Sequence, residues 1–161
     1  MKSTPKVAVG VLLLIVGVAV GWVVAKTGAG QAVDLASLSD LERVFSERMR
    51  NVALVGHFTV EGREGGGRPE RYEVARVTKL NDGRWRFNVR MTYGSVDATL
   101  PITVPIVWAG DTPMVAITNF AIPTVGTFTA RVFFYQHRYA GSWQHGDVGG
   151  LMYGTIESIE S

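Results

Sequence analysis

The residues best suited to chemistry gather near the C-terminus, in residues 139–154. This stretch places Trp143, His145, Asp147 and Tyr153 among five glycines. Imidazole and carboxylate groups can transfer protons or bind metals, and aromatic rings can line a ligand site. Two interpretations stay open. The glycines could form a turn that arranges these groups around a ligand at a barrel mouth. They could instead let two strands pack closely while Trp143 closes the barrel end.

No catalytic or metal-binding motif accompanies these groups. Ser142, His145 and Asp147 are close in sequence, but no Gly-x-Ser-x-Gly elbow surrounds the serine. The three histidines lack His-x-x-x-His spacing, so a metal site would need His137 and His145 to meet from distant strands. Cysteine is absent, which excludes disulfides, thiolate zinc sites and a cysteine nucleophile. The sequence therefore predicts no enzyme, no metal and no cofactor.

Aromatic residues are the better candidates for binding, because pockets for small apolar ligands are lined mainly by aromatic and aliphatic side chains. Several of them fall on the predicted inner face of strands or in the glycine-rich stretch. The candidate ligand-binding residues are Trp85, Phe87, Trp108, Phe134, His137, Tyr139, Trp143, His145 and Tyr153.

Charge argues against nucleic acid as a partner. The whole chain has a formal net charge of +2, but Lys2, Lys6 and Lys26 flank an apolar segment at the N-terminus. Without them, residues 27–161 carry thirteen basic and fourteen acidic side chains, a net charge of −1. A domain with this balance lacks the basic surface that binds nucleic acid.

Residues 7–25 predict a membrane-spanning helix. They form nineteen residues without a charge. In a helix they would be about 28 Å long, close to the thickness of the hydrocarbon core of a bilayer. We expect an uncleaved anchor in the cell membrane, with residues 1–6 in the cytoplasm, because more positive charge precedes the span than follows it. The alternative is a cleaved signal peptide, which would leave the domain secreted.

Two further features belong to this N-terminal region. Gly17 and Gly21 have the spacing that lets two membrane helices approach closely, which would make a homodimer. We expect residues 26–38 to form a linker and residues 39–161 to form one extracytoplasmic domain.

The domain begins with a predicted amphipathic helix over about residues 40–51. Ser39 and Glu42 match a capping box, in which each side chain binds a free backbone amide of the first turn. Apolar residues follow at helical spacing and predict one buried stripe. The stripe consists of Leu41, Val44, Phe45, Met49 and Val52.

The remainder alternates as β strands do. Residues 72–80 and 84–93 predict a hairpin closed by Asn81-Asp82-Gly83, with Gly83 in the left-handed region. This register sets Val77 opposite Phe87 and Ala75 opposite Val89.

Two later segments carry special signals. In residues 98–108, Pro101 and Pro105 remove two donors from one strand edge, so this strand is expected at a sheet edge or at the seam of an incompletely closed barrel. In residues 127–139 the aromatic alternation changes phase at Phe133, which indicates a bulge or two covered faces. The pattern predicts an all-β antiparallel barrel or sandwich of about seven or eight strands with one short helix.

The chain resembles a family of small membrane-anchored or secreted bacterial proteins with a β domain, to which no activity is assigned. The resemblance covers roughly residues 54–157 and rests on Trp85-x-Phe87, on residues 108–113 and 126–131, and on residues 139–143. In fold, the family is loosely similar to the calycins, the lipocalin and avidin group. The resemblance implies no site residues.

From these observations we expect a membrane-anchored, non-enzymatic binding or assembly module outside the cytoplasmic membrane. The alternative is a calycin-like carrier that holds a small apolar ligand in a barrel cavity. The expected partners are the bilayer, through residues 7–25, and a protein or a small apolar ligand.

Overall fold

The computed structural model describes residues 30–63, 67–93, 96–122 and 126–159. The predicted membrane span lies outside these residues. Within them, neither helical segment has the length and apolarity that a membrane crossing requires.

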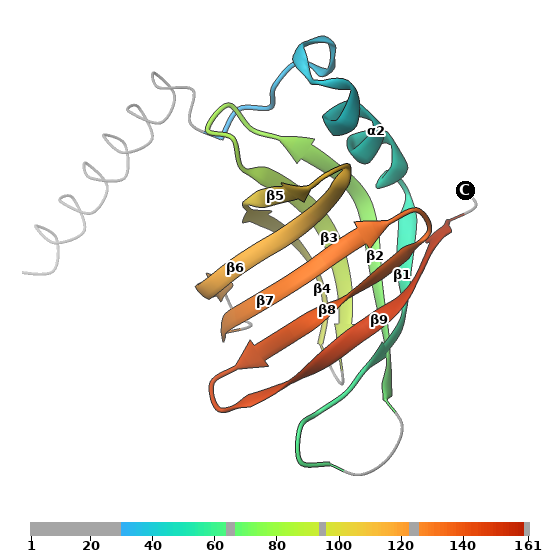
Figure 1. The fold of residues 1–161 in the computed structure, drawn as a ribbon, viewed down its shortest axis with the longest axis vertical. Helices are drawn as coiled ribbons and strands as arrows, with labels where there is room; N and C mark the ends of the chain where they lie inside the picture. The colour runs from blue at the N-terminus through green and yellow to red at the C-terminus, as the bar shows by residue number, and fades with distance from the viewer. Residues whose placement is uncertain (1–29, 64–66, 94–95, 123–125, 160–161) are drawn as a thin grey trace, which may run out of the picture.

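The described residues form one antiparallel sheet of nine strands, in the order β4-β3-β2-β1-β9-β8-β7-β6-β5. Figure 1 shows the sheet curling on itself into a barrel-like shape. The strands are β1 (Val52–Phe58), β2 (Arg68–Lys79), β3 (Trp85–Tyr93), β4 (Val96–Val104), β5 (Ile106–Ala109), β6 (Thr112–Ile122), β7 (Gly126–Tyr135), β8 (Arg138–His145) and β9 (Val148–Ser158).

The all-β antiparallel class is confirmed, and the number of strands is higher than the seven or eight expected. One reason is a hairpin inside residues 127–139, where Tyr135 pairs with Arg138. Gln136 adopts a left-handed conformation there, with a φ of 52°.

The predicted change of phase at Phe133, with its bulge or doubly covered strand, was therefore wrong. β7 keeps its alternation up to the turn: Val132 and Phe134 are buried, while Phe133 and Tyr135 are exposed on the outer face. No glycine or asparagine marks the turn.

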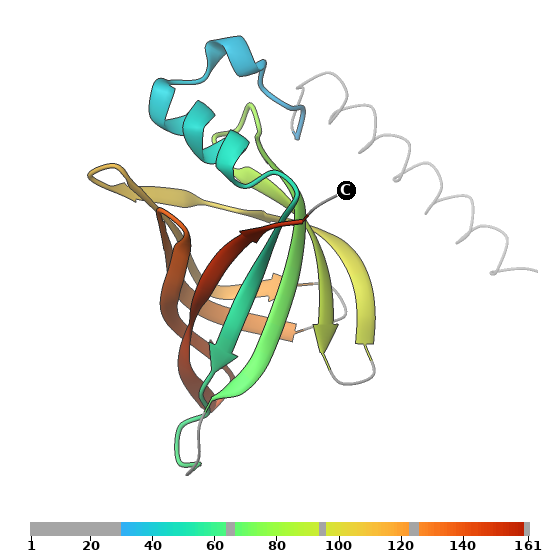
Figure 2. The ribbon, with the colours of Figure 1, turned by 90° about the vertical axis from the view of Figure 1, so that its right-hand side faces the viewer.

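The prolines mark the barrel seam, as expected. The predicted strand over residues 98–108 is divided at Pro105 into β4 and β5. Among the described residues, β4 pairs only with β3, and β5 pairs only with β6. Because β4 and β5 are the two ends of the strand order, the chain crosses from one sheet edge to the other at Pro105. The result is a nearly closed barrel (Figure 2).

The β2–β3 hairpin confirms most of its predicted register. Val77 lies opposite Phe87, and Gly83 has a φ of 83°. The pairing of Ala75 with Val89 was wrong, because a bulge between Val74 and Arg76 moves Val74 into that place. The bulge shifts the inward alternation of β2 by one position, so that Val74 and Val77, three residues apart, are both buried; the predicted register had assumed an unbroken alternation.

A short helical layer covers one end of the barrel. It consists of the 3-10 helix η1 (Leu35–Ser37) and the helix α2 (Asp40–Arg48), whose capping box between Ser39 and Glu42 is formed. α2 ends three residues before the predicted end. The predicted buried stripe is only partly right: Phe45 and Met49 are buried, but Leu41 and Val44 are 46% and 49% exposed.

Phe45 fills the barrel end beneath α2. Its ring centroid lies 5.4 Å from that of Trp85, 6.0 Å from those of Trp108 and Phe134, and 6.3 Å from that of Phe87. Three of these contacts are edge-to-face, an arrangement that adds to the burial of the rings. The core therefore joins α2 to strands from both sides of the seam.

We expect Phe45→Ala to destabilise the protein by about 3–5 kcal/mol, since it opens a cavity among four aromatic rings. Urea unfolding of the full chain in detergent micelles measures this loss. The neighbouring Val44→Ala is the matched control and should change stability by less than about 0.5 kcal/mol, because Val44 is exposed. Equal losses for both variants would contradict the packing described.

Candidate functional site

The aromatic candidates divide into separate groups instead of forming one site. Trp85, Phe87, Trp108 and Phe134 pack around Phe45 in the covered end of the barrel. This end is closed by side chains of the protein itself. These four residues belong to the packed core, and their predicted ligand-lining role stays a prediction.

The histidines also lie apart. His137 is in the β7–β8 turn, and His145 is at the opposite end of β8. At the usual strand rise they are separated by about 26 Å. His145 stacks on Phe128, with ring centroids 4.5 Å apart. In the part of the chain that the structure describes, no three His, Asp or Glu side chains come close enough to hold a metal ion.

The glycines of residues 139–154 allow close packing. Tyr139 on β8 pairs with Gly154 on β9, and Trp143 pairs with Gly150. A Cβ added at Gly154 would lie 2.8 Å from Cε1 of Tyr139, and one added at Gly56 would lie 2.6 Å from its hydroxyl oxygen. Side chains at these positions would displace the Tyr139 ring. These contacts favour the second interpretation of this stretch.

Tyr139 reaches a buried carboxyl group that the sequence analysis did not identify. Its hydroxyl donates to Oε1 of Glu70 at 2.8 Å, and the hydroxyl of Tyr72 donates to Oε2 at 2.9 Å. Glu70 is only 9% exposed. The available signal was the alternation of β2, which puts Glu70 on the same face as the apolar Tyr72 and Val74.

Burial raises the pKa of the Glu70 carboxyl above its ordinary value of 4.5, although the two tyrosine hydroxyls act in the opposite direction. The pKa of Tyr139 is also raised, first by burial and then by its bond to Glu70. Since each carboxyl oxygen already accepts a hydroxyl proton, we interpret this cluster as part of the barrel wall rather than as an acid–base catalyst.

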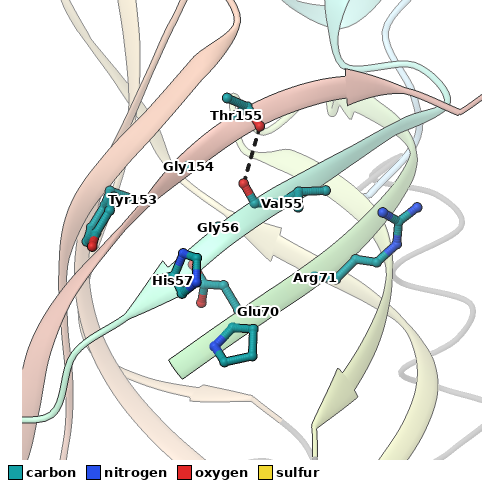
Figure 3. Close-up of a pocket in the computed structure, with 9 residues that line it drawn as sticks. Val55, Gly56, His57, Glu70, Arg71, Tyr153, Gly154 and Thr155 are labelled. Carbon is teal, nitrogen blue, oxygen red and sulfur yellow. Dashed lines mark hydrogen bonds between the residues drawn. The ribbon is translucent and has the colours of Figure 1, made fainter. Parts of the chain in front are cut away.

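A shallow groove of about 630 Å³ lies over the outer face of β9, β1 and β2. Figure 3 shows Tyr153, His57 and Arg71 standing on these three neighbouring strands. The rings of His57 and Tyr153 are 6.3 Å apart and tilted by 32°. The groove is lined by Val55, Gly56, His57, Pro69, Glu70, Arg71, Tyr153, Gly154 and Thr155. Tyr153 is thus the one aromatic candidate that faces it.

The groove continues into a longer apolar row on the outside of the sheet. One residue from each of seven neighbouring strands lies directly beside the next, because the register pairs them in turn. We call this row the outer belt. It consists of Val107, Met114, Phe133, Ala140, Tyr153, His57 and Pro69. All but His57 are apolar or aromatic, and Val107, Phe133 and Tyr153 are among the most exposed large hydrophobic residues of the described chain.

Basic residues flank the outer belt. Arg71 and Arg138 lie in the adjacent row toward α2, and Arg131 lies in the adjacent row on the other side. Leu151, next to Tyr153 on the same face of β9, is 58% exposed and widens the apolar area. An apolar centre with arginines at its margin is the composition of a protein-binding surface.

Comparisons of this chain with protein-family models, with curated proteins and with solved structures gave no match. The functional conclusion is therefore drawn from the geometry of the described residues.

The outer belt was not found from the sequence, because its neighbouring members are 7 to 96 positions apart in the chain and adjoin only through strand pairing. The only local signal was that large aromatic residues such as Phe133 and Tyr153 occupy outward positions. Solvent-facing positions of several strands are rarely aromatic.

Glu70→Gln should change the pH dependence of stability. Because the folded chain holds this proton more tightly, Glu70 contributes stability that is present below pH about 4.5 and is lost as pH rises through its folded pKa. The free energy of unfolding of the wild type, relative to that of Glu70→Gln, should therefore fall as the pH rises above about 4.5, by about 1.4 kcal/mol per unit of pKa shift.

Tyr139→Phe tests the same cluster from the other side. The variant removes a hydrogen-bond donor that stabilises the ionised carboxylate, so the pKa of Glu70 should rise further. The fall in the free energy of unfolding should therefore continue to a higher pH than in the wild type. Urea unfolding over a pH series measures both variants. If the free energy of unfolding of the wild type and that of Glu70→Gln differed by the same amount at every pH, a raised pKa of the Glu70 carboxyl would be contradicted.

Proposed function

We propose that this protein is a membrane-anchored, non-enzymatic binding module that holds a protein partner on its outer belt. The observation that carries the proposal is the row of apolar and aromatic residues across neighbouring strands, interrupted only by His57. Single exposed apolar residues are normal on protein surfaces, whereas contiguous apolar area of this kind marks an interaction site.

The size of the outer belt fits a protein partner. Its five strands from β7 to β2 cover about 19 Å at the usual strand spacing. Because a specific interface usually covers about 800 Å² per side, a partner bound here would also contact Leu151, the groove beside Tyr153 and the flanking rows. The groove is shallow and open, which suits an apolar protuberance of a protein.

The arginines beside the outer belt indicate which charge the partner carries. Arg71, Arg131 and Arg138 stand at the margin of the outer belt. Arg71 is already paired with Glu73 at 3.2 Å, so among the described residues Arg131 and Arg138 carry the positive charge that no carboxylate balances. We therefore infer that the partner has an apolar centre with acidic residues around it. Complementary margins of this type direct the encounter, while the apolar centre supplies most of the affinity.

A photo-crosslinking amino acid in place of Tyr153 should yield one adduct of defined mass in native membranes. The same amino acid in place of Thr99, an exposed residue on the outer face of β4, is the control and should yield none. Gel mobility and mass spectrometry of the purified adduct measure the result.

Leu151→Asp should abolish the adduct at position 153, because a carboxylate in the apolar centre must be desolvated when the partner binds. Thr99→Asp should leave the adduct unchanged. An adduct that forms equally from positions 153 and 99, or that survives Leu151→Asp, would overturn the assignment of the outer belt as the binding surface.

A carrier function is the second candidate, and a different observation favours it. At the barrel end away from α2, the inward-facing Met91, Phe120 and Phe128 are only half-buried. Trp143 packs its ring edge-on against Phe58, yet its buried Nε1 has no hydrogen-bond partner among the described residues. An apolar ligand with one acceptor atom would satisfy this donor.

Native mass spectrometry of the full chain, released from detergent micelles, tests the carrier. A bound small molecule should appear as an added mass of a few hundred daltons that disappears on denaturation. Trp143→Phe, which removes only the indole donor, should reduce the fraction of protein carrying it. A protein mass without any addition would count against the carrier and leave the binding module as the function.

A further inference from the structure

We propose that the exposed apolar face of η1 and α2, formed by Leu35, Leu41 and Val44, rests on the lipid bilayer. The barrel would then be held with its α2 end against the membrane. This inference rests on the proposed anchor and adds an orientation and a lipid contact to it.

The barrel leaves this face uncovered. Leu35, Leu41 and Val44 are 48%, 46% and 49% exposed, although the two helical segments that carry them contain only twelve residues. In α2, Leu41, Val44, Phe45 and Met49 form one wide apolar arc, because residues three and four apart lie on the same side of a helix. Phe45 and Met49 enter the barrel, whereas Leu41 and Val44 stay exposed. The barrel therefore covers only part of the arc.

Several contacts keep the apolar face turned outward. Ser46 is buried and its hydroxyl donates to the carbonyl of Val77 at 2.7 Å. Nζ of Lys79 lies 2.5 Å from Oε1 of Glu42, and both side chains are mostly covered. These bonds tie α2 to β2, so the helix cannot rotate to bury Leu41 and Val44 within the domain.

The start of the described chain is fixed to the same end of the barrel. Arg86 donates to the carbonyl of Gly30 at 3.0 Å, and the amide of Asn81 donates to that of Gln31. The amide of Val33 donates to the carbonyl of Lys79. The chain is therefore attached beside the β2–β3 turn, at the end that carries η1 and α2 (Figure 2).

The length of the chain before Gly30 places this end near the bilayer. Between Ala25, the last residue of the apolar span, and Gly30 there are five peptide steps. Even fully extended they reach about 18 Å. The opposite end of the barrel, where β9 begins, is about 33 Å further along the strand. If residues 7–25 span the membrane, the α2 end is the only end that can touch it.

The charges on α2 favour an apolar rather than an electrostatic contact. Arg43 lies 3.2 Å from Asp40 and 3.5 Å from Glu47, so the exposed charged groups of the helix pair with one another. The other basic side chain of the helix, Arg48, is half-buried and donates to the carbonyl of Phe134. With three acidic and two basic residues in α2, attraction to anionic headgroups is weak. Insertion of apolar side chains at the headgroup boundary is then the force that holds the face to the bilayer.

The orientation has a consequence for the proposed partner. With the α2 end on the bilayer, the strands run away from the membrane, and the outer belt faces sideways. A partner that is itself attached to the same membrane can then reach Tyr153 and Phe133 without the barrel detaching.

The experiment uses the absence of native cysteine. Val44→Cys and Val148→Cys each introduce a single thiol, and both valines are 49% exposed, at opposite ends of the barrel. Each full-length variant is labelled with an environment-sensitive fluorophore. It is then reconstituted into vesicles of phosphatidylethanolamine and phosphatidylglycerol that contain a lipid with a quencher near its headgroup.

We expect quenching at position 44 to exceed that at position 148 severalfold and to persist at high salt, where charge attraction is screened. Leu41→Asp in the Val44→Cys background should restore most of the fluorescence, and Leu151→Asp should not. Equal quenching at both positions, or quenching at position 44 that salt removes, would overturn the apolar contact.

Flotation of the same vesicles separates this inference from the proposed anchor. Protein that floats with the vesicles but shows no quenching at position 44 overturns the lipid contact and leaves the anchor in place. Protein that does not float overturns both. If a second copy of the chain covered the face instead, position 44 would be shielded from the lipid quencher, and the inference would likewise fail.

Discussion

The insertion of Phe45 among four aromatic rings is the interaction on which the rest of the structure depends. It joins α2 to Trp85 and Phe87 on one side of the seam and to Trp108 and Phe134 on the other. The two sheet edges cannot be joined by a full ladder of backbone hydrogen bonds, because Pro105 separates β4 from β5. Side-chain packing takes the place of the missing ladder and closes this end of the barrel.

The inner face of the barrel, its outer face and α2 differ in the side chains that they carry. The inner face holds the aromatic core and, further along, the carboxyl of Glu70 between two tyrosine hydroxyls. The outer face carries the apolar belt with arginines at its margin. Leu41 and Val44 extend the apolar arc of α2 beyond the part that the barrel covers. The proposed function would use these surfaces separately, one against the membrane and the other for a partner.

The glycine-rich C-terminal stretch shows how a sequence feature can indicate architecture instead of chemistry. Its aromatic and imidazole groups suggested a ligand site, yet Tyr139 occupies the space that Gly56 and Gly154 leave free. His137 lies in the turn before β8 and His145 at the far end of β8, because a strand extends its residues along its length. Proximity in sequence therefore did not become proximity in space.

By itself, the sequence determined the antiparallel all-β class, the capped helix, the turn at Gly83 and the seam at Pro105, because each depends on local backbone chemistry. It also determined the inward face of β3, through alternation. Only the tertiary structure decided the hairpin at Gln136, the bulge beside Val74, the burial of Glu70 and the outer belt. These depend on which strands become neighbours and in what register, and pairing between distant segments is set by the packing of the whole barrel rather than by any short run of residues.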